Sequence, residues 1–225
     1  MPRAIVLLSG GLDSATCLLI ARQEAGEVLA LSFDYGQRHA VELDRARALA
    51  ARYGAVSHRI VRLDYPAPSS SALTDAEREV PRHALGRERI PATYVPARNT
   101  LFLAHAVAWG EAEGVADIYI GANALDYSGY PDCRPEFLEA FEAAANLGTK
   151  AGVEGALRFR VHAPLLAMTK GEIVAAGHRL GLDFTLTSSC YDPSPTGRPC
   201  GGCDSCLLRA KGFQEAGLRD PVTGL

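Results

Sequence analysis

Residues 4–25 read AIVLLSGGLDSATCLLIARQEA, and this stretch decides the fold. Its continuous apolar run, Ile5–Leu8, is typical of a strand that is buried on both faces of a parallel sheet. From Leu12 onward the apolar residues recur at helical spacing until Gly26 provides a stop signal. The intervening S-G-G, residues 9–11, therefore joins the carboxyl end of a strand to the amino end of a helix.

The junction between this strand and this helix is a predicted anion site. The first amide N–H groups of a helix have no partner within the helix, and the helix dipole places partial positive charge there. Glycine lets a phosphate approach the backbone closely, and Ser9 and Ser14 can add hydroxyl donors. Asp13 is unusual beside a phosphate unless a divalent cation lies between them, so it is a candidate ligand of Mg²⁺. The alternative is a tight turn with a serine cap, because one glycine-rich turn is a weak signal.

Composition and charge favour a protein that acts on small molecules. The 225 residues are 48% hydrophobic and 22% charged, which is enough to bury one sizeable core with an appendage. A net charge of −3 and a pI near 6.1 argue against a nucleic-acid backbone as the main partner. The apolar run before Ser9 is too short for a signal peptide, and no stretch approaches the ~18 apolar residues of a membrane span. We therefore expect a cytoplasmic protein without a membrane partner.

The rest of the chain alternates between predicted strands and helices. Further strands are expected at residues 27–33, 55–64, 117–121 and 159–164. Helices are expected at residues 37–53, 100–113 and 135–147, and a Thr169–Glu172 capping box begins a last helix that ends near Gly181. Five strands that alternate with helices favour the α/β class, with a doubly wound parallel sheet. Residues 66–91, rich in Pro, Ser, Arg and Glu, predict a flexible flap.

Four cysteines near the end of the sequence form a predicted metal site with the pattern C-x9-C-x2-C-x2-C: Cys190, Cys200, Cys203 and Cys206. Cysteines stay reduced in the cytoplasm, and four thiolates at this spacing can surround one tetrahedral ion. Such a site has no open position, so we expect a structural zinc ion. An iron–sulfur cluster is the rival, since C-x2-C-x2-C also begins ferredoxin-type sequences, and unbound thiols are the plain alternative.

The residue identities in S-G-G-L-D-S, residues 9–14, indicate a function more specifically than the spacing of its glycines does. It resembles the PP-loop of the ATP pyrophosphatases, which have an adenine nucleotide α-hydrolase-like fold, and it lacks the G-K-[ST] ending of a Walker A loop. The resemblance implies that ATP is attacked at its α-phosphate, which releases pyrophosphate and transfers AMP to the substrate. Adenylation of this kind turns a carboxylate or amide oxygen into a leaving group.

Five further patches extend the resemblance: F-D-Y-G-Q-R-H from residue 33, V-P-A-R-N from 95, S-G-Y-P-D-C-R from 128, S-C-Y from 189 and C-G-G-C-D-S-C-L-L-R from 200. Together they resemble the 7-cyano-7-deazaguanine synthase family. The resemblance implies an ATP-dependent ligase of queuosine biosynthesis that converts 7-carboxy-7-deazaguanine and ammonia to 7-cyano-7-deazaguanine (preQ0), through adenylated carboxylate and amide intermediates. It also implies a PP-loop domain at residues 1–185 and a zinc-binding segment at residues 186–225. A homodimer is one expectation for the assembly.

The resemblance assigns roles to individual residues. Nucleotide binding falls on one continuous stretch: Leu8, Ser9, Gly10, Gly11, Leu12, Asp13, Ser14, Ala15, Thr16, Cys17 and Leu18. Catalytic roles fall on Asp13, Arg98 and Lys170, of which Asp13 would hold Mg²⁺. Substrate binding falls on Tyr35, Gln37, Arg38, Asn99, Asp132 and Arg134. Of these, Asp132 and Arg134 are the predicted readers of the deazaguanine ring, because a carboxylate accepts from guanine-type N–H groups.

Each of these roles has a structural alternative. The residues after the second strand can cap a helix, Arg98 can form a surface ion pair, Asp132 can stabilise a turn, and Lys170 can be solvated. The sequence leaves the role of Cys133 open.

Two other functions also stay open. A PP-loop enzyme that modifies tRNA, by thiolation or lysidine-type ligation, needs a persulfide cysteine or a basic RNA-binding surface. The sequence shows neither a separate RNA domain nor excess positive charge. A non-catalytic zinc module that responds to nucleotide would release AMP slowly and convert no deazaguanine.

Overall fold

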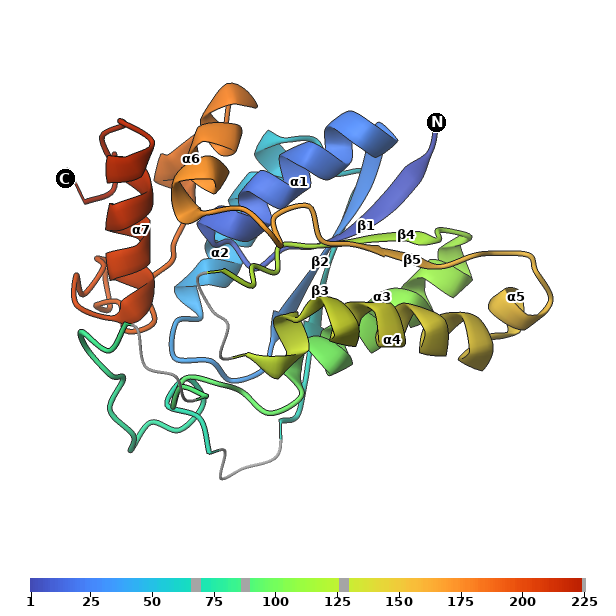
Figure 1. The fold of residues 1–225 in the computed structure, drawn as a ribbon, viewed down its shortest axis with the longest axis horizontal. Helices are drawn as coiled ribbons and strands as arrows, with labels where there is room; N and C mark the ends of the chain where they lie inside the picture. The colour runs from blue at the N-terminus through green and yellow to red at the C-terminus, as the bar shows by residue number, and fades with distance from the viewer. Residues whose placement is uncertain (66–69, 86–89, 126–129, 224–225) are drawn as a thin grey trace.

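Five parallel strands form one sheet at the centre of the structure, a computed structural model that describes residues 1–65, 70–85, 90–125 and 130–223 (Figure 1). The strands are β1 (Arg3–Leu7), β2 (Glu27–Asp34), β3 (Ser57–Arg62), β4 (Asp117–Ile120) and β5 (Arg160–His162). Their order across the sheet is β3-β2-β1-β4-β5, and every neighbouring pair is parallel. The five-stranded parallel sheet predicted from the sequence is confirmed.

The strand order reverses direction at β1. The chain runs from β1 outward to β2 and β3 and then returns to place β4 on the other side of β1, so that Leu7 pairs with Leu31 and with Ile120. Such a reversal opens a crevice at the carboxyl ends of the two central strands, where ligands bind in open α/β sheets. The S-G-G junction after β1 and the segment after β4 therefore meet at one edge of the sheet.

Helices cover both faces of the sheet. They are α1 (Leu12–Ala25), α2 (Val41–Arg52), α3 (Arg98–Glu113), α4 (Pro135–Gly148), α5 (Lys150–Val153), α6 (Lys170–Arg179) and α7 (Asp204–Glu215), with the 3-10 turns η1 (Pro131–Cys133) and η2 (Phe184–Leu186). In Figure 1, α1 and α6 lie on one side of the sheet, and α3 and α4 lie on the other. Short α5 follows α4 at the outer end of the molecule.

Alternate residues of β1 show how the apolar run is used. Ala4 and Val6 are buried in the core that contains side chains of α1, α2, α6 and α7. Ile5 and Leu7 are buried in the core that contains side chains of α3 and α4. The strand therefore needs apolar residues at every position, because helices cover both of its faces. The doubly wound arrangement predicted from the sequence is confirmed.

The largest difference from a predicted boundary is at the start of α2. The helix begins at Val41 rather than at residue 37. Gln37 instead turns its side chain back to the end of β2: its Oε1 accepts from the Tyr35 N–H (2.9 Å), and its Nε2 donates to the Phe33 carbonyl (3.0 Å). Local bonds of this kind compete with helix formation, so the helix starts only after this turn.

The C-terminal segment packs against the α/β layers. Helix α7 packs on α6, and Arg209 on α7 forms an ion pair with Asp220 in which Nε and Oδ2 are 2.8 Å apart. The side chains of these two residues are 5% and 0% exposed. The end of the described chain is therefore held to the domain by a buried charge pair whose members also hydrogen-bond to neighbouring groups.

Part of the segment that the sequence predicts to be a flexible flap is packed. Ser71, Ala72 and Leu73 are 0% exposed. The His83 N–H donates to the carbonyl of Gly202, 3.0 Å away, in the cysteine-rich segment. Residues 66–69 and 86–89 lie outside the described residues, and movement of the flap stays a prediction.

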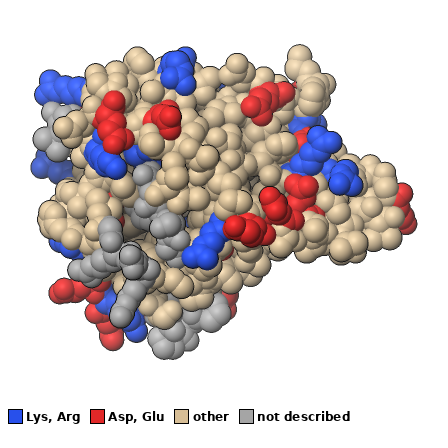
Figure 2. All heavy atoms as spheres, in the orientation of Figure 1, with Lys and Arg blue, Asp and Glu red and all other residues tan. Residues whose placement is uncertain are grey.

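No helix in the described part of the chain is both long enough and apolar enough to cross a membrane. On the face drawn in Figure 2, Lys and Arg side chains alternate with Asp and Glu and form no continuous basic patch.

Candidate active site and metal centre

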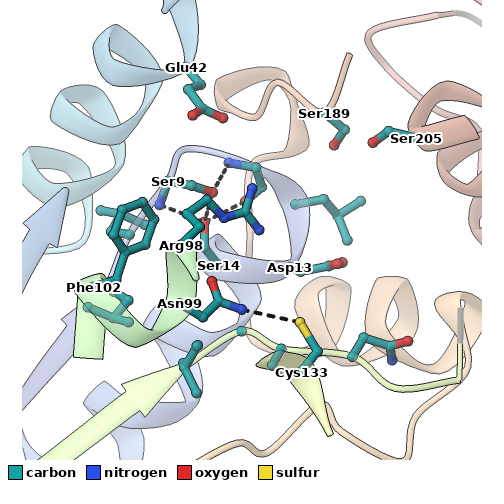
Figure 3. A pocket seen from close by; sticks show the side chains of 18 of the residues that line it. Ser9, Asp13, Ser14, Glu42, Arg98, Asn99, Phe102, Cys133, Ser189 and Ser205 are labelled. Atoms are coloured by element: carbon teal, nitrogen blue, oxygen red, sulfur yellow. Dashed lines mark hydrogen bonds between the residues drawn. The ribbon is translucent and has the colours of Figure 1, made fainter. Parts of the chain in front are cut away.

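The S-G-G-L-D-S junction forms a loop that its two serines brace (Figure 3). The Oγ atoms of Ser9 and Ser14 are 3.0 Å apart, and Ser9 Oγ accepts from the Gly11 N–H (3.2 Å). Ser14 Oγ donates to the Gly11 carbonyl (3.0 Å). Gly11 is the N-cap of α1 and no side chain caps this helix end. The first turn of α1 therefore keeps amide donors for an anion.

Gly10 fits a position that no other residue can take without strain. Its φ is +94°, and a Cβ there would lie 2.2 Å from the carbonyl oxygen of Glu42 and 2.9 Å from the amide nitrogen of Ala46. The loop thus passes directly over the first turns of α2. This contact fixes the loop relative to Glu42.

Two predicted catalytic residues meet at the crevice. The Nζ atom of Lys170 lies 2.9 and 2.8 Å from the two carboxylate oxygens of Asp13. Asp13 is in the first turn of α1, and Lys170 is the first residue of α6, which begins with the predicted Thr169–Glu172 capping box. Lys170 is only 5% exposed, so its ammonium group is held in one place.

A pocket opens over this junction, lined by residues from the carboxyl ends of β1, β2 and β4, from α3 and from the C-terminal segment. The predicted residues that line it are Leu8, Ser9, Gly11, Leu12, Asp13, Ser14, Tyr35, Arg98, Asn99 and Lys170. The structure therefore brings together predicted residues from four separate stretches of the sequence.

Arg98 enters the pocket from the first turn of α3 (Figure 3). Its Nε is buried and has no hydrogen-bond partner in the part of the chain that the structure describes. Arg98 therefore does not form the surface ion pair that was its structural alternative with any residue that the structure describes. A guanidinium stays charged in proteins, so the pocket holds a cation that an anionic ligand group can neutralise.

Helix α3 is capped by a residue from elsewhere in the chain. Its N-cap, Ala97, has φ +52° and makes no side-chain cap. Instead, Asp132 Oδ2 accepts from the Asn99 N–H (3.0 Å), and Asn99 Nδ2 donates to the Asp132 carbonyl (3.1 Å) and to Cys133 Sγ (3.2 Å). Asp132 is not among the residues that line the pocket. In this position Asp132 stabilises the first turn of α3, which contains Arg98. Its predicted contact with the deazaguanine ring stays a prediction.

A buried polar cluster adjoins the pocket at the start of α2. Gln37 Nε2 donates to Glu42 Oε1 (3.3 Å), and His39 Nε2 lies 3.4 Å from the same oxygen. Burial raises the pKa of Glu42 to about 8, although the nearby cation of Arg98 acts in the opposite direction. Burial also lowers the pKa of His39 to about 4, so this imidazole is neutral near pH 7.

His39 and Glu42 line the pocket, yet neither is among the predicted site residues. A glutamate in the first turn of a helix is ordinarily read as a partner of the helix dipole. Only the fold shows that this glutamate is 9% exposed and faces the crevice.

Several predicted residues lie outside the pocket lining: Gly10, Ala15, Thr16, Cys17, Leu18, Gln37, Arg38, Asp132 and Arg134. Ala15, Thr16, Cys17 and Leu18 are 0% exposed in α1, where they support the loop from within. The Arg38 N–H donates to the Leu73 carbonyl (3.0 Å), so Arg38 anchors the packed part of the 70–85 segment. Ligand contacts of these residues stay predictions.

Residues of the C-terminal segment complete the pocket and were not predicted to do so: Ser188, Ser189, Tyr191, Ser205, Leu208 and Arg209. Further lining residues that sequence reasoning missed are Phe33, Phe102, Asn123, Tyr130 and Cys133. One feature of the sequence could have indicated them: in S-C-Y, the lining residues Ser189 and Tyr191 stand on either side of Cys190, a cysteine of the metal site. Their place in the wall of the pocket depends on how the cysteines fold.

The four clustered cysteines converge on one point. The Sγ atoms of Cys190, Cys200, Cys203 and Cys206 all lie within 4.8 Å of one another. Backbone amides point at two of them: the Cys200 N–H donates to Cys190 Sγ (3.1 Å) and the Cys203 N–H to Cys200 Sγ (3.4 Å). Such donors favour thiolates, so the cluster fits a tetrahedral metal ion with no open position. The predicted four-cysteine cluster is confirmed.

Comparisons with known proteins agree with this arrangement. The model of a family described as queuosine biosynthesis protein QueC matches residues 3–217. A 7-cyano-7-deazaguanine synthase of Geotalea daltonii is 60% identical over 220 residues, which cover 98% of this chain and 95% of that protein. One of Geobacter sulfurreducens is 59% identical and the match covers 98% of this chain and 92% of that protein.

A solved structure is also similar in fold. It is a 4-thiouridine synthetase in complex with RNA and with bound ATP, and it has a TM-score of 0.51 and 21% identity. The match covers 96% of this chain and 50% of that chain. At this identity the likeness concerns the fold alone.

A doubly wound sheet, a PP-loop at its strand reversal and a crevice above that loop define an α/β protein of the PP-loop class. The match over nearly the full sequence is more specific than the fold. The chain belongs to the queuosine biosynthesis protein QueC family.

Proposed function

We propose that this chain catalyses the ATP-dependent conversion of 7-carboxy-7-deazaguanine and ammonia to 7-cyano-7-deazaguanine in queuosine biosynthesis. The observation that carries this proposal is the pocket at the reversal between β1 and β4. There the uncapped start of α1 lies beside two cations, Arg98 and Lys170. This combination suits a nucleotide together with an acidic substrate, and the names of the relatives specify the product.

The chemistry needs adenylation because a carboxylate does not react with ammonia. Transfer of AMP from ATP to the carboxylate releases pyrophosphate and replaces a poor leaving group with a good one. Ammonia then displaces AMP, loses a proton and leaves the amide. A second ATP adenylates the amide oxygen, and loss of AMP and a proton from that intermediate gives the nitrile. Both activations attack an α-phosphate, so one site can perform both.

The residues of the crevice divide this work. The loop from Ser9 to Ser14 holds the pyrophosphate portion of ATP through backbone amides and hydroxyl groups. Asp13 would hold Mg²⁺, which would neutralise phosphate charge, and Lys170 approaches the same phosphates. Arg98 binds the substrate carboxylate or the α-phosphate and stabilises the charge that develops during transfer.

The four cysteines hold a structural zinc ion in this proposal. A d¹⁰ ion with four thiolate ligands has no open position and does no chemistry on the substrate. The segment that contains these cysteines also supplies Ser188, Ser189, Tyr191 and Ser205 to the wall of the pocket, so the ion would help to hold this wall in place. The zinc-binding segment and the PP-loop domain, residues 1–185, thus share one active site.

The buried state of the other two cysteines favours this reaction over thiolation of tRNA. Burial raises the pKa of Cys133 to about 11 and raises the pKa of Cys17 as well. The thiolate is the form that carries sulfur chemistry, and both groups are protonated near pH 7.

The test is incubation of the protein with ATP, Mg²⁺, an ammonium salt and 7-carboxy-7-deazaguanine, followed by mass spectrometry. We expect the nitrile as the product, with the amide as an intermediate and with AMP rather than ADP released. AMP formation without any change in the deazaguanine would overturn the proposal in favour of a nucleotide-responsive zinc module. AMP formation that depends on tRNA would favour a tRNA-modifying enzyme.

A further inference from the structure

One buried acid in the pocket has no role in the reaction as described above. Glu42 is 9% exposed and lines the pocket, and Figure 3 shows its carboxylate pointing into the open space near Ser9. Its Oε1 is held by Gln37 and lies beside His39. Its Oε2 accepts no hydrogen bond from the described residues. The carboxylate therefore has Oε2 and a second lone pair of Oε1 available to accept from whatever occupies the pocket.

The orientation of this carboxylate is fixed by the backbone. Gln37 cannot exchange its amide oxygen and nitrogen, because Oε1 accepts from the Tyr35 N–H (2.9 Å) while Nε2 donates to the Phe33 carbonyl (3.0 Å). The same Nε2 donates to Glu42 Oε1 (3.3 Å). The end of β2 thus holds Glu42 through one side chain, and we expect little rotation of the carboxylate.

Aromatic side chains in the lining of the same pocket suit a flat aromatic ligand. Phe33 and Phe102 line the pocket and stack on each other with ring centroids 4.0 Å apart. Tyr35 and Tyr191 line it as well. Aromatic faces of this kind bind planar heterocycles, and a carboxylate beside them can read a polar edge of the ring.

Two planar ligands of the proposed reaction are candidates for the position next to Glu42: the adenine of ATP and the deazaguanine ring. Their hydrogen-bonding edges differ. Adenine presents an amino donor next to a ring nitrogen that is an acceptor, so one oxygen of a carboxylate would face a lone pair. A deazaguanine presents a ring N–H next to an amino group, and both are donors. An ionised carboxylate, which only accepts, is complementary to the second edge.

We propose that Glu42 is the specificity-determining residue that recognises the deazaguanine ring, by accepting hydrogen bonds from its ring N–H and its amino group, with Gln37 as the residue that positions it. This inference rests on the proposed function for its substrate class. It assigns the ring to Glu42 rather than to Asp132, because Glu42 lines the pocket and Asp132 does not.

The test compares Glu42→Gln with the parent on two ligands, 7-carboxy-7-deazaguanine and its analogue that lacks the amino group. Glutamine keeps the size of the side chain but places an amide donor opposite the donors of the ring. For the acid we expect KM to rise by roughly ten-fold or more, because charge-assisted hydrogen bonds in a buried site are lost. KM for ATP should stay within about two-fold. A glutamine amide offers adenine both a donor and an acceptor, as the protonated carboxyl of Glu42 does. The parent should prefer the amino compound by at least about ten-fold, and the variant should lose this preference.

Glu139→Gln is the matched control, because Glu139 is an exposed glutamate on α4 and should leave both KM values unchanged. An unchanged KM for the acid in Glu42→Gln overturns the inference, and so does a rise in KM for ATP that equals or exceeds the rise for the acid. A parent enzyme that accepts both ring compounds equally overturns it without any variant, which covers the case in which Glu42→Gln does not fold. Failure of the parent to form any nitrile instead overturns the proposed function.

Discussion

The ammonium of Lys170 forms a bidentate ion pair with the carboxylate of Asp13, with N–O distances of 2.9 and 2.8 Å. The two residues are 157 positions apart in the chain. Each residue lies in the first turn of a helix, and the two helices, α1 and α6, pack on the same face of the sheet. The pair therefore connects the PP-loop to the last helix of the α/β layer. It also means that the carboxylate expected to bind Mg²⁺ is already next to a cation.

Replacement of Asp13 by Asn should abolish formation of AMP and pyrophosphate while the protein stays folded. The variant keeps the size of the side chain but lacks the charge that we propose positions Mg²⁺, so we expect a loss of at least about a hundred-fold in rate. Release of pyrophosphate measures the adenylation step, and circular dichroism checks the fold. Asp44→Asn is a suitable control, because the Asp44 side chain is 77% exposed on α2. Normal pyrophosphate release by Asp13→Asn would remove Asp13 from the reaction.

Loss of one metal ligand should damage both stability and the pocket. Cys203 is 0% exposed, and its replacement by Ser should release the ion and lower the melting temperature by several degrees or more. Because Ser188, Ser189 and Tyr191 line the pocket beside the cysteines, the folded fraction should also bind substrate more weakly. Elemental analysis gives the metal content, and visible absorption of the parent separates an iron–sulfur cluster from zinc. A variant without metal that melts with the parent would contradict a structural ion.

Removal of the carboxylate of Asp132 should weaken the start of α3. Asp132→Ala leaves the Asn99 N–H without its acceptor, and loss of an N-cap costs about 1 kcal/mol of unfolding free energy. Denaturant unfolding measures this cost, with Thr169→Ala, which removes the side-chain cap of α6, as a comparison of the same kind. If Asp132→Ala keeps the stability of the parent but raises KM for the acid roughly ten-fold, the ring contact predicted from the sequence is correct.

Affinity for the deazaguanine acid should rise with pH. Burial raises the pKa of Glu42 to about 8, whereas burial lowers that of His39 to about 4 and raises that of Tyr35 to about 12, and Arg98 stays charged. Between about pH 6 and pH 9, Glu42 is thus the member of this cluster whose charge changes. In our proposal the deazaguanine ring binds the ionised carboxylate of Glu42. The dissociation constant of the acid should therefore fall about ten-fold per pH unit up to pH 8 and then level off.

Calorimetric titration of the acid across this range checks the profile. Glu42→Gln carries no charge at any of these pH values, so its dissociation constant should not follow the same curve. A flat profile in the parent would show that ionisation of Glu42 is not linked to binding of the acid.

Local patterns in the sequence were sufficient for the fold and for part of the site. The apolar run Ile5–Leu8, the glycines after it and the helical spacing from Leu12 predicted the strand, loop and helix that the structure shows. The spacing of the four cysteines predicted their cluster. These features depend on residues that are close in the chain, where backbone geometry alone restricts the outcome.

The tertiary structure decided what depends on distant residues. The sequence did not show that Asp132 caps α3 by accepting from the Asn99 N–H, and its contact with the ring stays a prediction. Glu42 drew no attention in the sequence, and only the crossing of the PP-loop over α2 shows that it lies against Gly10 and in the pocket wall.

The sequence by itself determined the class of this protein, because a PP-loop, alternating strands and helices, and a cysteine pattern are all written in short stretches of chain. Which side chains share the pocket was decided only when β4 paired with β1 and the cysteine segment folded over the crevice. The physical reason is that burial, hydrogen-bond partners and pKa values are set by neighbours in space. For Glu42 and Arg98 those neighbours come from elements far apart in the sequence.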